Sequence, residues 1–142
     1  MGSGAVREVR PEVADQLSVG AMVARVTAQL RPSLGGAAER EARDLITAVM
    51  ERPRSWASTA AAAPIDATNA GRILAATERR AAGAPLAYAV GNAPFRHLLL
   101  MVDERVLIPR PETEGIVQAL LRRNRRPDPL VLDVGTGSGC LA

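Results

Sequence analysis

Apolar residues recur every three or four positions through the first half of the chain, which is the spacing of helices with one buried face. The spacing predicts helices over residues 19–31, 38–52 and 67–82. Ser18 and Asp66 are expected to begin the first and third helices, because their side chains accept hydrogen bonds from the free N–H groups of a first turn. Pro32 and Pro53 are expected to end the first and second helices, since proline disrupts a helix interior. Residues 17–83 therefore read as a small helical bundle.

The pattern changes in the second half of the chain. Two β-rich runs, residues 94–102 and 105–108, flank Asp103-Glu104, and this arrangement predicts a hairpin that turns at these two acids. Pro109 and Pro111 then open a predicted helix, whose apolar face carries Ile116, Val117, Leu120 and Leu121. Residues 130–134 are apolar on both faces, as strands of a parallel sheet between helices are. The predicted fold class is an α-helical N-terminal bundle, then a β-hairpin linker and the start of an α/β domain.

Composition sets broad limits on the class of protein. The chain has 142 residues, a formal net charge of +3, 18 basic residues that are all arginine, and one cysteine. One cysteine excludes an intramolecular disulfide, and no apolar run approaches the roughly 18 residues that a membrane span needs. The N-terminus lacks the apolar core of a signal peptide. We therefore expect a cytoplasmic protein that makes no contact with a membrane.

Two features that suggest a metal or a nucleic acid are weak. His97 is the only histidine, and no cluster of metal ligands accompanies it, so no metal site is expected. The arginine cluster at residues 122–126 ends a predicted helix, where cations are favourable, and no aromatic residues interleave with it. No direct contact with nucleic acid is expected, and a monomer is the expected state.

The most informative motif is a glycine loop that follows the last apolar run. Asp133 stands at the end of the predicted strand, and glycines occupy every second position after it, at Gly135, Gly137 and Gly139. Glycine lets the backbone turn sharply and lets a ligand approach main-chain N–H groups. The N-terminus of a following helix would add partial positive charge, which suits a carboxylate or phosphate. The loop is therefore a candidate site for a nucleotide cofactor.

Two cofactor classes compete for this loop. Residues 137–142 satisfy the dinucleotide pattern G-x-G-x-x-G/A, which would place a pyrophosphate at the helix start. That match begins past the end of the predicted strand, and the acid expected about 20 positions further on would lie beyond Ala142. The acid-first pattern, Asp133 followed by the three glycines, instead resembles the first motif of Rossmann-like S-adenosylmethionine methyltransferases.

A second motif precedes the loop in the chain. Residues 106–114 read Val-Leu-Ile-Pro-Arg-Pro-Glu-Thr-Glu, in which a proline and two carboxylates also make a good helix start. Together with Leu-Asp-Val-Gly-Thr-Gly-Ser-Gly at residues 132–139, it resembles the HemK/PrmC family, the protein-glutamine N-methyltransferases that modify peptide chain release factors. Arg79-Arg80, the segment from Gly83 to Gly91, and Pro94-Phe95 agree with the same family.

The resemblance implies an N-terminal helical domain that helps to hold the release factor, a hairpin linker and a Rossmann-like catalytic domain. Such enzymes transfer a methyl group from S-adenosylmethionine to the side-chain amide nitrogen of the glutamine in a Gly-Gly-Gln motif. The matching cofactor residues are Gly135, Thr136, Gly137, Ser138 and Gly139, with Asp133 bracing the loop. The active-site walls would be formed by Phe95, Pro109, Arg110, Pro111, Glu112, Thr113 and Glu114.

The resemblance also divides the chain and shows what it lacks. The expected parts are a loose tail at 1–16, a helical substrate-recognition domain at 17–90, a β-hairpin linker at 91–108 and the start of the methyltransferase domain at 109–142. Family catalysis depends on an Asn-Pro-Pro-Tyr motif that orients the substrate amide, and these 142 residues do not contain it. No catalytic residue is therefore assigned, and the chain by itself is expected to be inactive. Two alternatives stay open: a non-catalytic helical module that binds a release factor, and a fragment of a nicotinamide-dependent enzyme.

Overall fold

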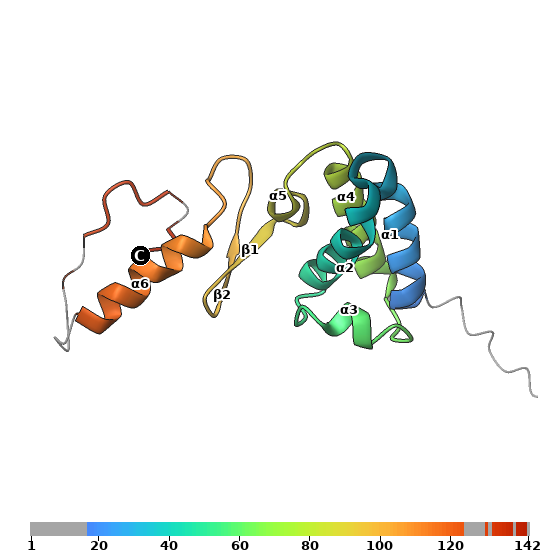
Figure 1. Ribbon diagram of the computed structural model, residues 1–142, viewed down its shortest axis with the longest axis horizontal. Coiled ribbons are helices and arrows are strands. Elements are labelled where there is room, and N and C mark those ends of the chain that lie inside the picture. The colour runs from blue at the N-terminus through green and yellow to red at the C-terminus, as the bar shows by residue number, and fades with distance from the viewer. Residues whose placement is uncertain (1–16, 124–129, 131, 138, 142) are drawn as a thin grey trace, which may run out of the picture.

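A computed structural model describes residues 17–123, 130, 132–137 and 139–141 of the chain. Its helices and strands are α1 (Val19–Leu34), the 3-10 helix η1 (Gly35–Ala37), α2 (Ala38–Val49), α3 (Trp56–Thr59), α4 (Ala67–Ala81), α5 (Leu86–Val90), β1 (Asn92–Phe95), β2 (Leu98–Met101) and α6 (Pro111–Arg123). In Figure 1 the helices α1 to α4 form a bundle at one end, the hairpin lies in the middle, and α6 lies at the other end. None of the described helices is long and apolar enough to cross a membrane.

Helix α1 begins where its sequence predicts and ends later than predicted. The Ser18 side chain accepts a hydrogen bond from the backbone N–H of Ala21 at 3.2 Å, which confirms it as the N-cap. Pro32 does not end the helix, because it lies in the last turn and the helix continues to Leu34. The end comes at Gly35, whose φ of 54° is a conformation that glycine adopts without strain.

Helix α2 also does not end at the proline where its end was predicted. It ends at Val49, before Pro53, and Glu51 then has a φ of 52°, so the chain has already left the helix. Helix α4 is as expected at both ends: the Asp66 carboxylate accepts a hydrogen bond from Asn69 N at 2.8 Å, and the last turn carries Arg79 and Arg80. The hydrogen bonds from Asn69 hold the pKa of Asp66 below its ordinary value.

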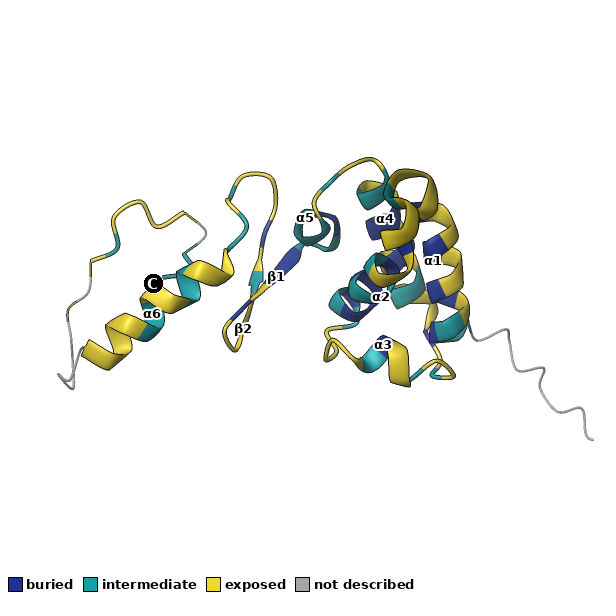
Figure 2. Ribbon diagram, viewed as in Figure 1, coloured by how far each residue is buried: buried dark blue, intermediate teal, exposed yellow. Residues whose placement is uncertain are grey.

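The apolar core lies inside the bundle. Helix α1 packs against α2 and α4, and α2 packs against α4. The largest fully buried side chains here are Met22, Leu30, Leu45, Ile46 and Ile73, and they come from the helical faces that the sequence pattern defines. Figure 2 shows this burial concentrated in α1, α2 and α4, whereas α6 is exposed or intermediate along its length. An ion pair reinforces the packing, because Arg80 Nε of α4 lies 2.6 Å from Glu41 Oε1 of α2.

The hairpin is confirmed, but its turn is elsewhere than predicted. Strands β1 and β2 are antiparallel, with Asn92 opposite Met101 and Phe95 opposite Leu98, so the turn lies at Arg96-His97. Arg96 has a φ of 53°, which is unusual for a residue other than glycine. The expected second strand at residues 105–108 is not formed.

Asp103 makes a turn after the hairpin instead of within it. Its carboxylate accepts hydrogen bonds from the backbone N–H and the guanidinium of Arg105, and its carbonyl accepts one from Val106 N at 3.1 Å. These contacts, the guanidinium foremost, lower the pKa of Asp103 to about 2. Asp103 therefore forms a turn, as the sequence predicts. The error is that this turn follows the hairpin and does not connect two strands.

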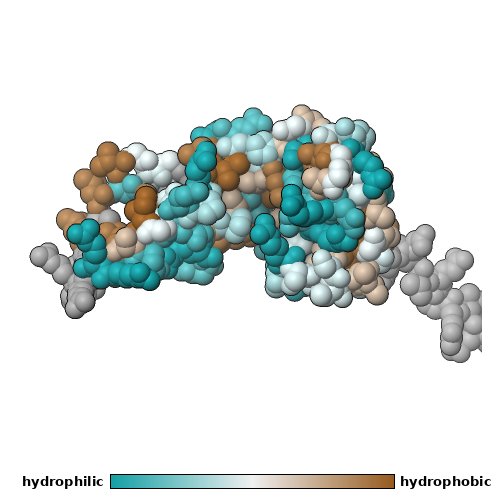
Figure 3. All heavy atoms as spheres, in the orientation of Figure 1, coloured by the Kyte–Doolittle hydropathy of each residue, from teal (hydrophilic) through white to brown (hydrophobic). Residues whose placement is uncertain are grey.

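The predicted strand at residues 130–134 is not seen among the residues described there. Leu130, Leu132 and Val134 are almost wholly exposed and are not part of a sheet. Figure 3 shows hydrophobic side chains gathered at the end of the molecule that carries α6 and this loop. The Rossmann-like start of a catalytic domain stays a prediction, because a parallel strand forms only beside neighbouring strands.

Candidate functional site

The segment predicted to form a wall lies between the Asp103 turn and the first turns of α6. Pro109 and Arg110 precede the helix, and Pro111 occupies its first position, where a missing N–H does no harm. Thr113 N donates to the Arg110 carbonyl at 3.0 Å, which closes the first turn. Glu112 and Glu114 bring negative charge to the helix N-terminus, where the helix dipole favours it. Local chemistry thus accounts for the shape of the motif.

Glu114 has a partner that the sequence does not indicate. Its Oε1 accepts a hydrogen bond from the backbone N–H of Arg96 at 2.8 Å. The Arg96 guanidinium in turn donates to Gln118 Oε1 at 3.1 Å, one turn further along α6. The turn of the hairpin therefore lies against α6, and Glu114 is occupied by this contact.

The glycine loop has the backbone geometry that its sequence predicts. Gly135, Gly137 and Gly139 have φ angles of 78°, 56° and 75°, so all three adopt a conformation that residues with a Cβ rarely do. Gly139 N donates to the Thr136 carbonyl at 2.8 Å and closes a tight turn. A Cβ at Gly135 or Gly139 would meet no atom within 4 Å, and one at Gly137 would meet only the Gly135 carbonyl oxygen at 3.9 Å. The glycines are thus required by the turn, and the described backbone around them is open.

Asp133 precedes this loop with one carboxylate oxygen unsatisfied. Its Oδ2 is buried and has no hydrogen-bond partner among the described residues. A buried carboxylate oxygen without a hydrogen-bond partner is unfavourable, because buried polar atoms in proteins are normally hydrogen-bonded. The unsatisfied Asp133 oxygen fits a ligand that brings an N–H or O–H donor, and the open glycine backbone fits one that also brings an acceptor for main-chain N–H groups. Ser138, which was also predicted to contact the cofactor, lies outside the described residues.

The predicted site residues are only partly brought together. Phe95 is 2% exposed, on β1, so it packs inside the protein and is not open to a ligand. Between the glycine loop and the segment Pro109–Glu114, no hydrogen bond or ion pair is found in the part of the chain that the structure describes. Both segments belong to the same end of the molecule (Figure 1). In that same part of the chain, no three His, Cys, Asp or Glu residues form a group that could hold a metal ion.

Some residues of structural importance were missed by sequence reasoning. Tyr88 of α5 donates from its hydroxyl to the Val106 carbonyl at 2.7 Å, and Arg79 of α4 donates to the Ala89 carbonyl from Nε at 2.9 Å. Arg79 and Tyr88 stand in segments that agree with the family resemblance, but nothing local indicates their partners. Arg96 carries no turn signal at all.

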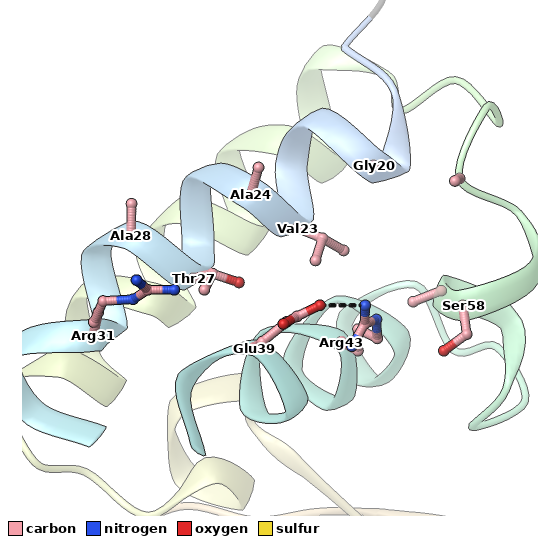
Figure 4. Close-up of a pocket in the computed structure, with 11 residues that line it drawn as sticks. Gly20, Val23, Ala24, Thr27, Ala28, Arg31, Glu39, Arg43 and Ser58 are labelled. Carbon is pink, nitrogen blue, oxygen red and sulfur yellow. Dashed lines mark hydrogen bonds and ion pairs between the residues drawn. The ribbon is translucent and has the colours of Figure 1, made fainter. Parts of the chain in front are cut away.

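The helical unit carries a groove between α1, α2 and α3, with a volume of about 660 Å³. Its lining is mostly small: Gly20, Val23, Ala24, Thr27, Ala28, Ala57, Ser58 and Ala61, with Arg31, Glu39 and Arg43 as the charged members. Figure 4 shows Glu39 and Arg43 paired on α2 across from the α1 side chains, and their ion pair measures 2.5 Å. Thr27 lines the groove, and its buried Oγ1 lacks a hydrogen-bond partner among the described residues. The groove suits a partner surface that approaches α1 closely.

Known proteins agree with the family that the motifs suggest. The family model for the PrmC N-terminal domain matches residues 21–91, which is half of the chain. Release factor glutamine methyltransferase from Aliivibrio fischeri is 35% identical over 126 residues, which are 89% of this chain and 44% of that protein. The protein of the same name from Burkholderia pseudomallei is 42% identical over 103 residues, which are 72% of this chain and 36% of that protein.

A shorter and stronger match points the same way. Release factor glutamine methyltransferase from Lactococcus lactis subsp. lactis is 57% identical over 58 residues, which are 41% of this chain and 22% of that protein. The chain spans less than half the length of these curated relatives. The family match covers α1 to α5, which are the elements that form and extend the helical unit. On this evidence the chain belongs to the HemK/PrmC family.

Proposed function

We propose that this chain is part of an S-adenosylmethionine-dependent enzyme that methylates the glutamine side-chain amide in the Gly-Gly-Gln motif of peptide chain release factors. The observation that carries the proposal is the match of residues 21–91 to the PrmC N-terminal domain, since the matched relatives are named release factor glutamine methyltransferases. The acid-first glycine loop follows at the C-terminal end of the same chain.

The glycine loop and Asp133 would hold the cofactor. S-adenosylmethionine would supply a methyl group on a positively charged sulfur, which is open to attack by a nitrogen lone pair. The open backbone of Gly135, Gly137 and Gly139 would let main-chain N–H groups approach the carboxylate of its methionine end. Asp133 Oδ2 would accept a hydrogen bond from the cofactor or from the loop that holds it. Thr136 and Ser138 complete the proposed loop.

The wall of the site would be built from the segment before the loop. Pro109 and Pro111 have fixed φ angles, Arg110 is restricted because it precedes a proline, and Thr113 is held by its hydrogen bond to the Arg110 carbonyl. Of the two acids, Glu112 is exposed and has no ion pair in the part of the chain described, whereas Glu114 holds the hairpin. Phe95 would support the wall from inside the protein.

The helical unit, residues 17–90, would recognise the release factor. The α1–α2–α3 groove is the surface we assign to it, because the small residues on α1 allow a partner to approach closely. A non-catalytic binding role for this unit is the second candidate, and its self-contained core favours it. The names of the matched relatives favour methyl transfer over nicotinamide chemistry. We further propose a cytoplasmic monomer that works without nucleic acid or a membrane.

The test of the proposed activity is methyl transfer by the longest reading frame that contains these 142 codons. It is incubated with radiolabelled S-adenosylmethionine and a purified release factor, and with the same factor after its Gly-Gly-Gln glutamine is changed to alanine. Label on the first factor and none on the second is expected. Failure to label either factor would refute the proposal. The 142 residues alone are expected to transfer no methyl group, since they lack the Asn-Pro-Pro-Tyr motif.

The recognition surface has its own test by calorimetric titration of the release factor. Ala28→Glu places a long acidic side chain in the groove, and Gln29→Glu adds the same charge at the neighbouring exposed position outside it. We expect weaker binding for the first variant and unchanged binding for the second. Equal affinities for the two variants would remove the groove from the docking surface.

A further inference from the structure

We propose that Tyr88 and Glu114 are positioning residues that fix α6, the helix that precedes the glycine loop in the chain, relative to the helical unit. The inference rests on the proposed function, because a substrate held by the helical unit must meet a cofactor held by the glycine loop. The two sites lie on different parts of the chain, so the geometry between them depends on what joins those parts. In Figure 1 the joining parts are α5 and the hairpin.

On the side of the joint nearest the bundle, hydrogen bonds and burial hold α5 and the hairpin to α4. Arg79 of α4 donates to the Ala89 carbonyl of α5 from both Nε and Nη2, at 2.9 and 2.5 Å. Gly91 ends α5 in the left-handed conformation, with a φ of 83°, and its carbonyl accepts a hydrogen bond from Val102 N at 3.1 Å. Ala89 and Val102 are buried. The positions of α5 and the base of the hairpin are therefore fixed relative to the bundle.

The side of the joint nearest α6 lacks such burial. No described side chain of α6 is buried, and its apolar residues Ile116, Leu120 and Leu121 are 59%, 44% and 60% exposed. Apolar burial, which usually fixes one element against another, therefore contributes little to the position of α6 within the described residues. Polar contacts must carry more of that task.

Tyr88 supplies the first of these contacts. Its hydroxyl donates to the Val106 carbonyl at 2.7 Å, and the two residues lie 18 positions apart. The bond is partly buried, so water competes with it less than at an open surface. It ties α5 to the segment that enters the motif Pro109–Glu114.

Glu114 supplies the second contact. Its carboxylate accepts the Arg96 N–H at 2.8 Å, and a hydrogen bond to a charged group is stronger than one between neutral groups. Arg96 holds a φ of 53°, which is strained for a residue with a Cβ and persists only where surrounding contacts hold it. The Arg96 guanidinium also donates to Gln118 Oε1 at 3.1 Å, one turn further along α6. Hairpin and helix are thus joined at two successive turns of α6.

The test measures the distance between the helical unit and α6 by electron spin resonance of two nitroxide labels. The full chain carries Cys140→Ser, with labels on Gln29→Cys of α1 and Ala119→Cys of α6, which are both exposed positions. Tyr88→Phe removes one hydroxyl, and Glu114→Ala removes one acceptor. We expect both to broaden and shift the distance distribution, while the thermal unfolding midpoint of the bundle stays unchanged. We also expect Glu114→Ala to raise the amide exchange rate of Arg96 about tenfold.

Two matched variants separate positioning from general damage. Glu114→Gln keeps an oxygen that accepts the Arg96 N–H, so it should keep a narrow distribution. Glu112→Ala removes the other acid of the same helix turn, which makes no hydrogen bond to the hairpin among the described residues, and it should have no effect. An unchanged distribution in both Tyr88→Phe and Glu114→Ala would overturn the proposal, as would a Glu114→Gln distribution as broad as that of Glu114→Ala. The readout involves no methyl transfer, so its failure would leave the proposed function untouched.

Discussion

Breaking the ion pair between Arg80 and Glu41 is expected to lower the free energy of unfolding of the helical unit. The coupling energy between the two side chains is expected to be about 2 kcal/mol. Arg80 Nε lies 2.6 Å from Glu41 Oε1, and the two side chains are 18% and 19% exposed. The pair joins the last turn of α4 to the first turn of α2. It therefore acts between helices that are distant in sequence.

The magnitude follows from the partial burial of the pair. Two unit charges about 4 Å apart attract by about 1 kcal/mol in water and by about 4 kcal/mol at the effective dielectric of a protein surface. Most of each side chain is withdrawn from water here, which moves the value above the aqueous limit. Desolvation and the loss of side-chain freedom oppose the attraction, so the net value is about 2 kcal/mol. Each single variant also loses a favourable charge at a helix end, worth about 0.3–1 kcal/mol.

A double-mutant cycle isolates the interaction from those helix-end effects. Urea unfolding of the chain is measured for Arg80→Ala, Glu41→Ala and the double variant, and the coupling energy is the departure from additivity. The matched control is the cycle on Arg43 and Glu39, a pair on one helix with side chains 38% and 57% exposed. The control pair should give about 0.3–0.5 kcal/mol. A coupling between Arg80 and Glu41 no larger than that of the control would refute the reasoning from burial.

Three further changes test the core, a helix cap and a turn. Leu45→Ala removes a side chain that is fully buried. It should lower the free energy of unfolding by about 3 kcal/mol in urea unfolding, and a loss below about 1 kcal/mol would show that the core is loosely packed there. Ser18→Ala should lower the free energy of unfolding, measured by thermal unfolding, by about 1 kcal/mol, and Ser18→Asp should keep the value of the unchanged chain. Equal stability of Ser18→Ala and the unchanged chain would show that Ser18 does not stabilise the helix as its N-cap. The Asp103 carboxylate has a pKa lowered to about 2 from the ordinary 3.8 by Arg105, so it stabilises its turn fully above pH 3.8 and loses this effect as the pH falls toward 2. Carbon NMR titration of Asp103 should show a higher midpoint in Arg105→Ala, and an unmoved midpoint would exclude the guanidinium as the cause.

The helical unit could be predicted from local sequence because each of its signals acts locally. The caps at Ser18 and Asp66 depend on hydrogen bonds to residues three positions away, and the buried faces depend on helical spacing. The predicted helix ends at Pro32 and Pro53 were wrong, because proline does not by itself decide where a helix ends. A proline in a last turn disturbs few hydrogen bonds, so a left-handed Gly35 and the departure of the chain at Glu51 decide the ends instead.

The hairpin turn could not be predicted because its support is remote. Asp103-Glu104 is a strong local turn signal, and it does form a turn, held by Arg105. Arg96-His97 has no such signal, yet the chain reverses there, since Glu114 accepts the Arg96 N–H from 18 positions away. The acid that looks like a helix-start residue in sequence is thus a partner of the hairpin in space.

The sequence by itself determined the helical bundle, the left-handed glycine loop and the family, because helical periodicity, capping, glycine conformation and motif order are all properties of short stretches of chain. Only the tertiary structure decided that Tyr88 reaches Val106, that Arg80 reaches Glu41 and that the hairpin turns at Arg96 against α6. Each of these contacts joins residues at least 18 positions apart in the chain. Local propensity carries no information about such pairs, whereas burial and hydrogen bonding in the folded chain select them.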